Sequence, residues 1–136
     1  MARIICIDYG LKRCGIAVTD MLQIIATGLK TVPEKELLPF LKSYVQQEEV
    51  EKILIGLPKN LDNTNTHATL PAQKAYESLR KAFPQIPVEQ IDEQYSSKRA
   101  VSAMHDMGMK KSQRRVKENV DLIAATMLLQ EYMGIR

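Results

Sequence analysis

Three carboxylates of this chain stand where a β-sheet could gather them at one edge. Asp8 ends an apolar strand-like run, Arg3–Asp8, and the pair Asp92 and Glu93 ends another such run. A carboxylate at the end of a buried strand is costly unless a cation or hydrogen bonds offset its charge. Taken singly, each of these acids could cap a loop or a helix N-terminus. Taken together, they favour a site for a hard cation, because Mg²⁺ is typically held by a few carboxylates and substrate phosphates.

A fourth carboxylate, Asp121, lies on the predicted last helix, one turn before Ala124 and Ala125. Alanines let a helix approach a sheet closely, so this helix could bring Asp121 toward the edge where Asp8 lies. The alternative role of Asp121 is that of an acid near a helix N-terminus, which complements the helix dipole. Its place about a turn and a half into the helix fits this alternative only in part.

Positive charge gathers immediately before Asp121, since residues 98–117 hold seven basic residues and one acid, Asp106. A charge run of this kind is either a solvated face or a segment that tracks a phosphate backbone. The candidates for phosphate contact are Lys110, Lys111, Arg114 and Arg115, together with Arg13 in the turn after Asp8. The alternative role of Arg13 is a structural salt bridge to an acid such as Asp20.

Five apolar runs predict the strands that must position these groups. They are Arg3–Asp8, Cys14–Thr19, Gln23–Leu29, Lys52–Leu57 and Val88–Asp92. Helical spacing predicts one helix that begins near Pro33 or Pro39, one over about residues 70–83, a short one between Ser96 or Ser97 and Gly108, and a last one over about residues 116–133.

This order of elements predicts an α/β fold with a five-stranded mixed sheet and helices on both faces. The first three strands form an antiparallel start, and strands one, four and five are parallel because right-handed helical crossovers join them. In such sheets the functional crevice lies at the carboxyl ends of the parallel strands. That rule selects Asp8, the Gly56–Pro58 segment and the pair Asp92 and Glu93.

Composition narrows the class of protein. The chain has 136 residues, 45% of them hydrophobic and 26% charged, which predicts one globular domain over residues 1–136. Its net charge of +3 permits a polyanionic partner. The absence of Trp argues against a protein that binds single-stranded nucleic acid by stacking the bases on aromatic side chains. Cys6 and Cys14 lie in apolar runs, and no run is long enough to span a membrane, so we expect a cytoplasmic protein with buried thiols.

Four motifs resemble those of the YqgF/RuvX family and follow the family's order over residues 3–132. Asp8–Asp20 is similar to D-x-G-x-x-R-x-G-x-A-x-x-D, and Gly56–Pro58 is similar to G-L-P. Asp92–Ala100 resembles D-E-R-x-[ST]-[ST]-x-x-A, with Gln94 in place of the arginine. The segment 121–132 resembles D-x-x-A-A-x-x-x-L-Q-x-Y.

The family is known as Holliday junction resolvases and as pre-16S ribosomal RNA processing nucleases with a ribonuclease H-like fold. The resemblance therefore implies that Asp8, Glu93 and Asp121 are the catalytic, metal-binding triad, with Mg²⁺ or Mn²⁺ as cofactor. Two such metals would activate the attacking water and stabilise the leaving 3′-oxygen. The motif positions with an expected structural role are Gly10, Gly15, Gly56, Pro58 and Asp92.

Only one acid of the pair Asp92 and Glu93 can enter a single site while the strand stays regular, because neighbouring strand residues point to opposite faces. The resemblance favours Glu93, whose longer side chain can also reach across the strand ends toward Asp8. Asp92 is the better acceptor for amides around Ser96, at the start of the next helix.

The predicted function is that of a metal-dependent endonuclease that processes the 5′ end of pre-16S ribosomal RNA. Its expected partner is pre-ribosomal RNA or branched DNA and not a membrane, and the chain is expected to be a monomer or a homodimer. The alternatives are a four-way DNA junction resolvase and a ribosome-precursor binding protein that does not cleave, because RNA and junction recognition leave no local signature here. Actin-like and sugar-kinase-like nucleotide binders also open with Asp-x-Gly, but they need two domains and this length leaves room for one.

Overall fold

The chain folds into a five-stranded sheet with the order β3-β2-β1-β4-β5. This is seen in a computed structural model, which describes residues 2–59, 67, 69–94 and 117–134, with the backbone alone at 58–59, 92–94 and 117–119. The strands are β1 (Arg3–Asp8), β2 (Arg13–Thr19), β3 (Ala26–Pro33), β4 (Val50–Lys59) and β5 (Val88–Gln94). β2 pairs antiparallel with β1 and β3, whereas β1, β4 and β5 are parallel. The predicted mixed sheet is confirmed.

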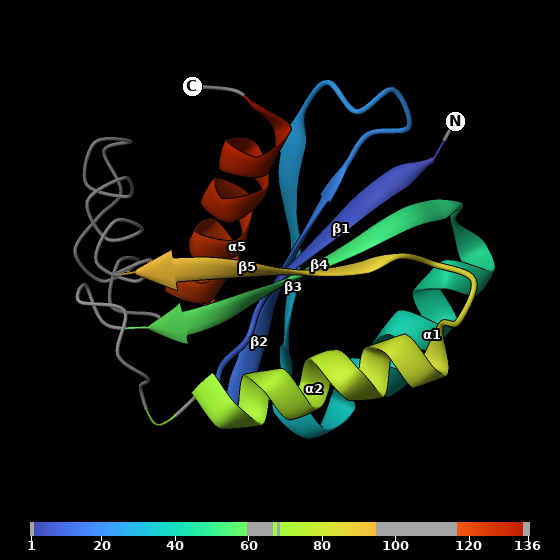
Figure 1. The fold of residues 1–136 in the computed structure, drawn as a ribbon. Coiled ribbons are helices and arrows are strands. Elements are labelled where there is room, and N and C mark those ends of the chain that lie inside the picture. The colour runs from blue at the N-terminus through green and yellow to red at the C-terminus, as the bar shows by residue number, and fades with distance from the viewer. Residues whose placement is uncertain (1, 60–66, 68, 95–116, 135–136) are drawn as a thin grey trace, which may run out of the picture.

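Helices cover both faces of the sheet (Figure 1). On one face lie α1 (Leu37–Gln47), which follows the short 3-10 helix η1 (Glu34–Glu36), and α2 (Thr69–Ala82). The other face is covered by α5 (Lys117–Met133). None of the helices within the described ranges is long and apolar enough to cross a membrane.

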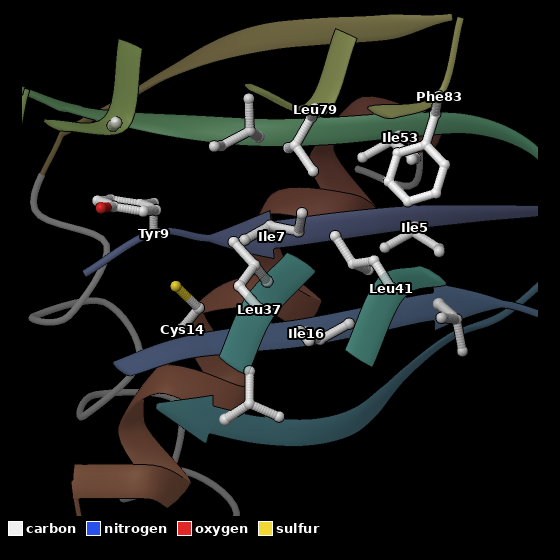
Figure 2. Packing of buried hydrophobic residues seen from close by; sticks show 14 of the residues in the cluster. Ile5, Ile7, Tyr9, Cys14, Ile16, Leu37, Leu41, Ile53, Leu79 and Phe83 are labelled. Atoms are coloured by element: carbon white, nitrogen blue, oxygen red, sulfur yellow. The ribbon is translucent and has the colours of Figure 1, made fainter. Parts of the chain in front are cut away.

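Each face of the sheet has its own core. Figure 2 shows the core beneath α1 and α2, where Leu41 and Leu79 from the helices lie against Ile5, Ile7 and Ile53 of the sheet. The core beneath α5 includes several small side chains, among them Cys6, Ala17 and Ala125. Small residues on both surfaces let α5 lie closer to the sheet than larger side chains would allow, and this closeness shapes the candidate site.

β3 begins at Ala26, three residues later than predicted, and it continues to Pro33. The cause is a turn built on Asp20, whose carboxylate accepts the backbone N–H groups of Ile24 at 2.7 Å and Ile25 at 2.8 Å. Gln23 within this turn has a φ of 58°, in the left-handed region. The prediction of a strand from Gln23 to Leu29 was therefore wrong at its start, because a side-chain hydrogen bond competed with strand pairing. It was also wrong at its end, because β3 stays paired with β2 as far as Pro33.

The first helix begins between its two candidate prolines, since Pro33 precedes η1 and α1 starts at Leu37. Pro39 is the third residue of α1, where a backbone N–H has no partner within the helix, so its missing donor costs nothing. The short helix predicted between residues 96 and 108 lies outside the described residues.

β4 and β5 both run two residues further than predicted, to Lys59 and Gln94. The last pair of β1 with β4 is Asp8 with Gly56, so Pro58 lies beyond the end of β1 and has a paired strand only in β5. A missing N–H is tolerated at such an edge-like position. The prediction that Pro58 ends its strand was wrong, and Asp92 lies inside β5 rather than at its end.

Candidate active site beneath the last helix

Strand alternation assigns Asp8 to the sheet face covered by α5. Ile4 and Cys6 belong to the core beneath α5, and Asp8 follows them at the same two-residue spacing. The residue is only 7% exposed, although it is the last residue of β1. A carboxylate this buried needs polar or cationic surroundings, as the strand-end argument anticipated.

Gly15 brings Asp121 to this buried carboxylate. It pairs with Asp8 in the antiparallel ladder, and a Cβ built on it would overlap the backbone carbonyl of Asp121. The backbone of α5 therefore passes directly over Gly15, and Ala124 and Ala125 one turn further on are fully buried. Asp8 and Asp121 thus flank the same glycine, and the predicted close approach of the last helix is confirmed.

Arg13 is the ion-pair partner of Asp121. Its Nε lies 2.9 Å from Oδ2 of the carboxylate, and the two side chains are 26% and 20% exposed. These two atoms lack the alignment of a hydrogen bond, so their contact is an electrostatic one. The alternative of a structural salt bridge at Arg13 is confirmed, but its partner is not the suggested Asp20. Asp20 lies past the opposite end of β2 and accepts backbone N–H groups of its own turn.

The thiol of Cys14, near the same end of the sheet, has a raised pKa. Burial is the main reason that its pKa is raised to about 12, and its hydrogen bond to the carbonyl of Gly10 acts in the opposite direction. The negative charges of Glu34, Asp8 and Asp121 raise the pKa further. Cys14 therefore stays protonated at neutral pH and is no nucleophile.

A second contact, which sequence reasoning missed, shapes the turn between Asp8 and Arg13. The hydroxyl of Tyr9 donates a hydrogen bond of 2.9 Å to Glu34, and the backbone N–H of Glu34 donates one of 3.0 Å to Lys12. Tyr9 is buried beside Cys14 (Figure 2), and burial together with Glu34 raises the pKa of its hydroxyl. Because Tyr9 and Glu34 come from separate elements, no local motif could have indicated the pair.

The glycines and the proline of the motifs take up backbone positions around the same edge. A Cβ on Gly10 would lie 2.5 Å from the carbonyl oxygen of Arg13, so the turn after Asp8 requires glycine. Gly56 pairs with Asp8 on one side and with Ile91 of β5 on the other. Pro58 pairs with Glu93 two residues further along β4.

The register separates positions 92 and 93. Ile91 packs against the core beneath α5, so position 93, two residues on, belongs to the face that holds Asp8. Position 92 pairs with Leu57, which belongs to the core beneath α1 and α2. Among the side chains that the structure describes, no three His, Cys, Asp or Glu residues form a metal-binding group; the side chain of Glu93 is not among them.

The predicted phosphate contacts, apart from Arg13, lie outside the described residues. They are Lys110, Lys111, Arg114 and Arg115.

Comparison with known proteins shows the family of the chain. A family model described as "RuvX: Holliday junction resolvase" matches residues 2–134. The chain belongs to the RuvX family. A relative from Christiangramia forsetii is 47% identical over 133 residues, which cover 98% of each chain. One from Bacteroides fragilis is 49% identical over 133 residues, covering 98% of this chain and 96% of its own. Both are described as "Putative pre-16S rRNA nuclease".

Solved structures confirm the ribonuclease H-like fold of this RuvX-family chain. Thermus thermophilus RuvC in complex with a Holliday junction superimposes with a TM-score of 0.55 at 15% identity, covering 99% of this chain and 98% of RuvC. The fowlpox virus resolvase bound to junction DNA gives a TM-score of 0.57 at 12% identity, covering 97% of each chain. At such identities the likeness concerns the fold.

Proposed function

We propose that this chain is a metal-dependent endonuclease that hydrolyses phosphodiester bonds at the 5′ end of pre-16S ribosomal RNA. The observation that carries the proposal is the approach of Asp121 to Asp8 across Gly15, at the carboxyl end of β1. Family membership supports the reaction class, and the descriptions of relatives 47% and 49% identical support the RNA substrate.

The donor set suits a hard divalent cation. Asp8, Asp121 and the proposed third ligand Glu93 offer carboxylate oxygens alone, which Mg²⁺ and Mn²⁺ prefer. Asp121 already has a cation, the Arg13 guanidinium, 2.9 Å from its oxygen, so positive charge is favourable at this place. A bound divalent cation supplies an activated water and stabilises the leaving 3′-oxygen. The protein itself holds the carboxylates close together. The hydrogen bond from Tyr9 to Glu34 stabilises the turn between Asp8 and Arg13.

Cleavage of two substrates side by side tests the proposal. One is a labelled RNA that carries the 5′ precursor segment joined to 16S sequence, and the other is a labelled four-way DNA junction. We expect cleavage of the RNA in Mg²⁺ or Mn²⁺ and none in EDTA. Cleavage of the junction alone would support a resolvase, which the description of the family model favours. Binding of the RNA without cleavage in any metal would identify a non-cleaving precursor-binding protein.

Substitutions at positions 92 and 93 test the third ligand. We expect Glu93→Gln to lose metal-dependent cleavage and to fold normally, because position 93 shares the sheet face of Asp8. Asp92→Asn is the matched control and should keep substantial activity, since an amide oxygen still accepts hydrogen bonds. The measurements are cleavage and Mn²⁺ titration of both variants. Loss of metal binding in Asp92→Asn with retention in Glu93→Gln would reverse the assignment.

The salt dependence of binding tests the basic segment before α5. If Lys110, Lys111, Arg114 and Arg115 contact phosphates, their replacement by Gln releases fewer counterions on binding. The slope of log K against log[salt] should then fall by roughly 0.7–0.9 for each lost contact. The measurement is RNA binding in Ca²⁺ at several salt concentrations. Equal slopes for variant and parent would make this segment a solvated face.

Domain organisation, localisation and oligomeric state follow from the same function. We propose a single domain over residues 1–136 that works in the cytoplasm, where ribosomal precursors are processed, as a monomer or a homodimer. Light scattering of the purified chain, alone and with RNA, separates the two states. A larger assembly would contradict both.

A further inference from the structure

The ion pair between Arg13 and Asp121 is held in place by the fold. Arg13 is the first residue of β2, and Gly15 two residues on lies against the backbone of Asp121. The two charged side chains are therefore brought together by a contact between backbones, not by the chance meeting of flexible surface groups. Both are mostly buried, and their N···O distance is 2.9 Å.

The pair places a permanent positive charge on one of the proposed metal ligands. A guanidinium does not lose its proton near neutral pH, so it can leave Asp121 only by moving. A divalent cation that binds the same carboxylate meets the repulsion of this charge. The contact between Nε of Arg13 and Oδ2 of Asp121 lacks hydrogen-bond alignment, so at this contact the move breaks no directed bond.

A hollow next to Arg13 offers a place for its guanidinium after such a move. It has a volume of about 210 Å³ and is bordered by Lys12, Arg13, Thr31, Val32 and Pro33. Two cationic side chains at one hollow suit an anion, and a guanidinium can grip a phosphate with two parallel hydrogen bonds. The charge at the border of this hollow would therefore favour a backbone phosphate of a nucleic acid.

We infer that Arg13 is an exchangeable counter-ion: it neutralises Asp121 while no metal is bound, and it turns to a backbone phosphate at the Lys12 hollow when a divalent cation takes Asp121. The inference rests on the proposed function, because it assumes that Asp121 is a metal ligand. Through this exchange, a single residue, Arg13, links metal binding to substrate binding. Metal and nucleic acid should then each strengthen the binding of the other.

The substitution Arg13→Gln has effects of opposite sign on the two ligands. Without nucleic acid, its affinity for Mn²⁺ should rise by roughly two- to fivefold, the range for loss of one partly screened charge. Its affinity for RNA in Ca²⁺ should fall, with a salt slope smaller by about 0.7–0.9. Lys12→Gln is the matched control, because it removes the same charge from the same hollow without touching Asp121. It should weaken RNA binding and leave Mn²⁺ affinity close to that of the parent.

Titration calorimetry with Mn²⁺ and the RNA-binding assay separate the outcomes. A Mn²⁺ affinity of Arg13→Gln equal to or below that of Lys12→Gln would overturn the inference while the proposed function stands. If Asp121→Asn binds Mn²⁺ as the parent does, the proposed metal site itself is wrong. The parent protein offers a measurement that needs no variant: Mn²⁺ should make Arg13 more reactive toward phenylglyoxal and leave the exposed Arg80 unchanged. Unchanged reactivity of Arg13 would count against its release.

Discussion

Asp8→Asn should abolish metal-dependent cleavage and should leave the folded protein at least as stable as the parent. Asp8 is 7% exposed and lies across Gly15 from Asp121, so two carboxylates share one small region. Without a metal their charges repel, and the amide removes one of the two charges at nearly the same volume. Loss of an outer-shell partner already costs metal sites about 10–100-fold, so loss of a ligand should reduce the cleavage rate by more than about 100-fold.

The measurements for Asp8→Asn are single-turnover cleavage in Mg²⁺ and thermal unfolding in EDTA. Asp20→Asn is the matched control: it makes the same change at the opposite end of β2, where an amide oxygen can still accept the N–H groups of Ile24 and Ile25. We expect this control to cleave at the parent rate. An Asp8→Asn variant that also cleaves at the parent rate would remove Asp8 from the site. A variant that unfolds would assign Asp8 a structural role instead.

Gly15→Ala should destabilise the protein and separate the two carboxylates. The new Cβ would overlap the backbone carbonyl of Asp121, which no side-chain rotation can relieve. Helix α5 must then move away from β2 and carry Asp121 with it. Overpacking of this kind typically costs about 1–3 kcal/mol, and we expect the upper end because the clash is with backbone. Mn²⁺ binding and cleavage should fall together with stability.

Gly28→Ala provides the comparison for this effect. Gly28 lies on β3 beneath the same helix, and a Cβ there would lie 2.7 Å from Cγ of Leu122, an atom of a side chain that can shift. Its free energy of unfolding should therefore change less than that of Gly15→Ala. Denaturant unfolding of both variants measures the difference. Equal stabilities would mean that α5 can yield at Gly15, and that the glycine does not set the distance between Asp8 and Asp121.

If Arg13 exchanges with a metal at Asp121, this carboxylate has a positively charged partner with and without the metal. The fold would then not depend on the metal for neutralisation at this position. Metal removal should then lower the thermal stability only slightly. Gly15→Ala, which disturbs the backbone contact behind the pair, should have the larger effect.

The sequence by itself determined the order of the elements and most of their bounds. Apolar alternation and helical spacing are local signals, and they predicted β1 without error and α2 and α5 to within about one residue. The same signals placed Asp8 at a strand end and Asp121 on the helix that returns to it. The alanines after Asp121 correctly indicated a close approach of that helix, because side-chain size is itself encoded in the sequence.

Tertiary structure alone decided which groups meet. The partner of Arg13 is Asp121 and not Asp20, because α5 packs directly on Gly15, and the sequence pattern does not say which acid Arg13 meets there. The hydrogen bond between Tyr9 and Glu34 likewise joins separate elements. β4 and β5 extend beyond their predicted last residues, because pairing between strands, not local propensity, determines how far a strand continues. Periodicity depends on neighbours along the chain, whereas a site depends on distances between elements, and only packing fixes those distances.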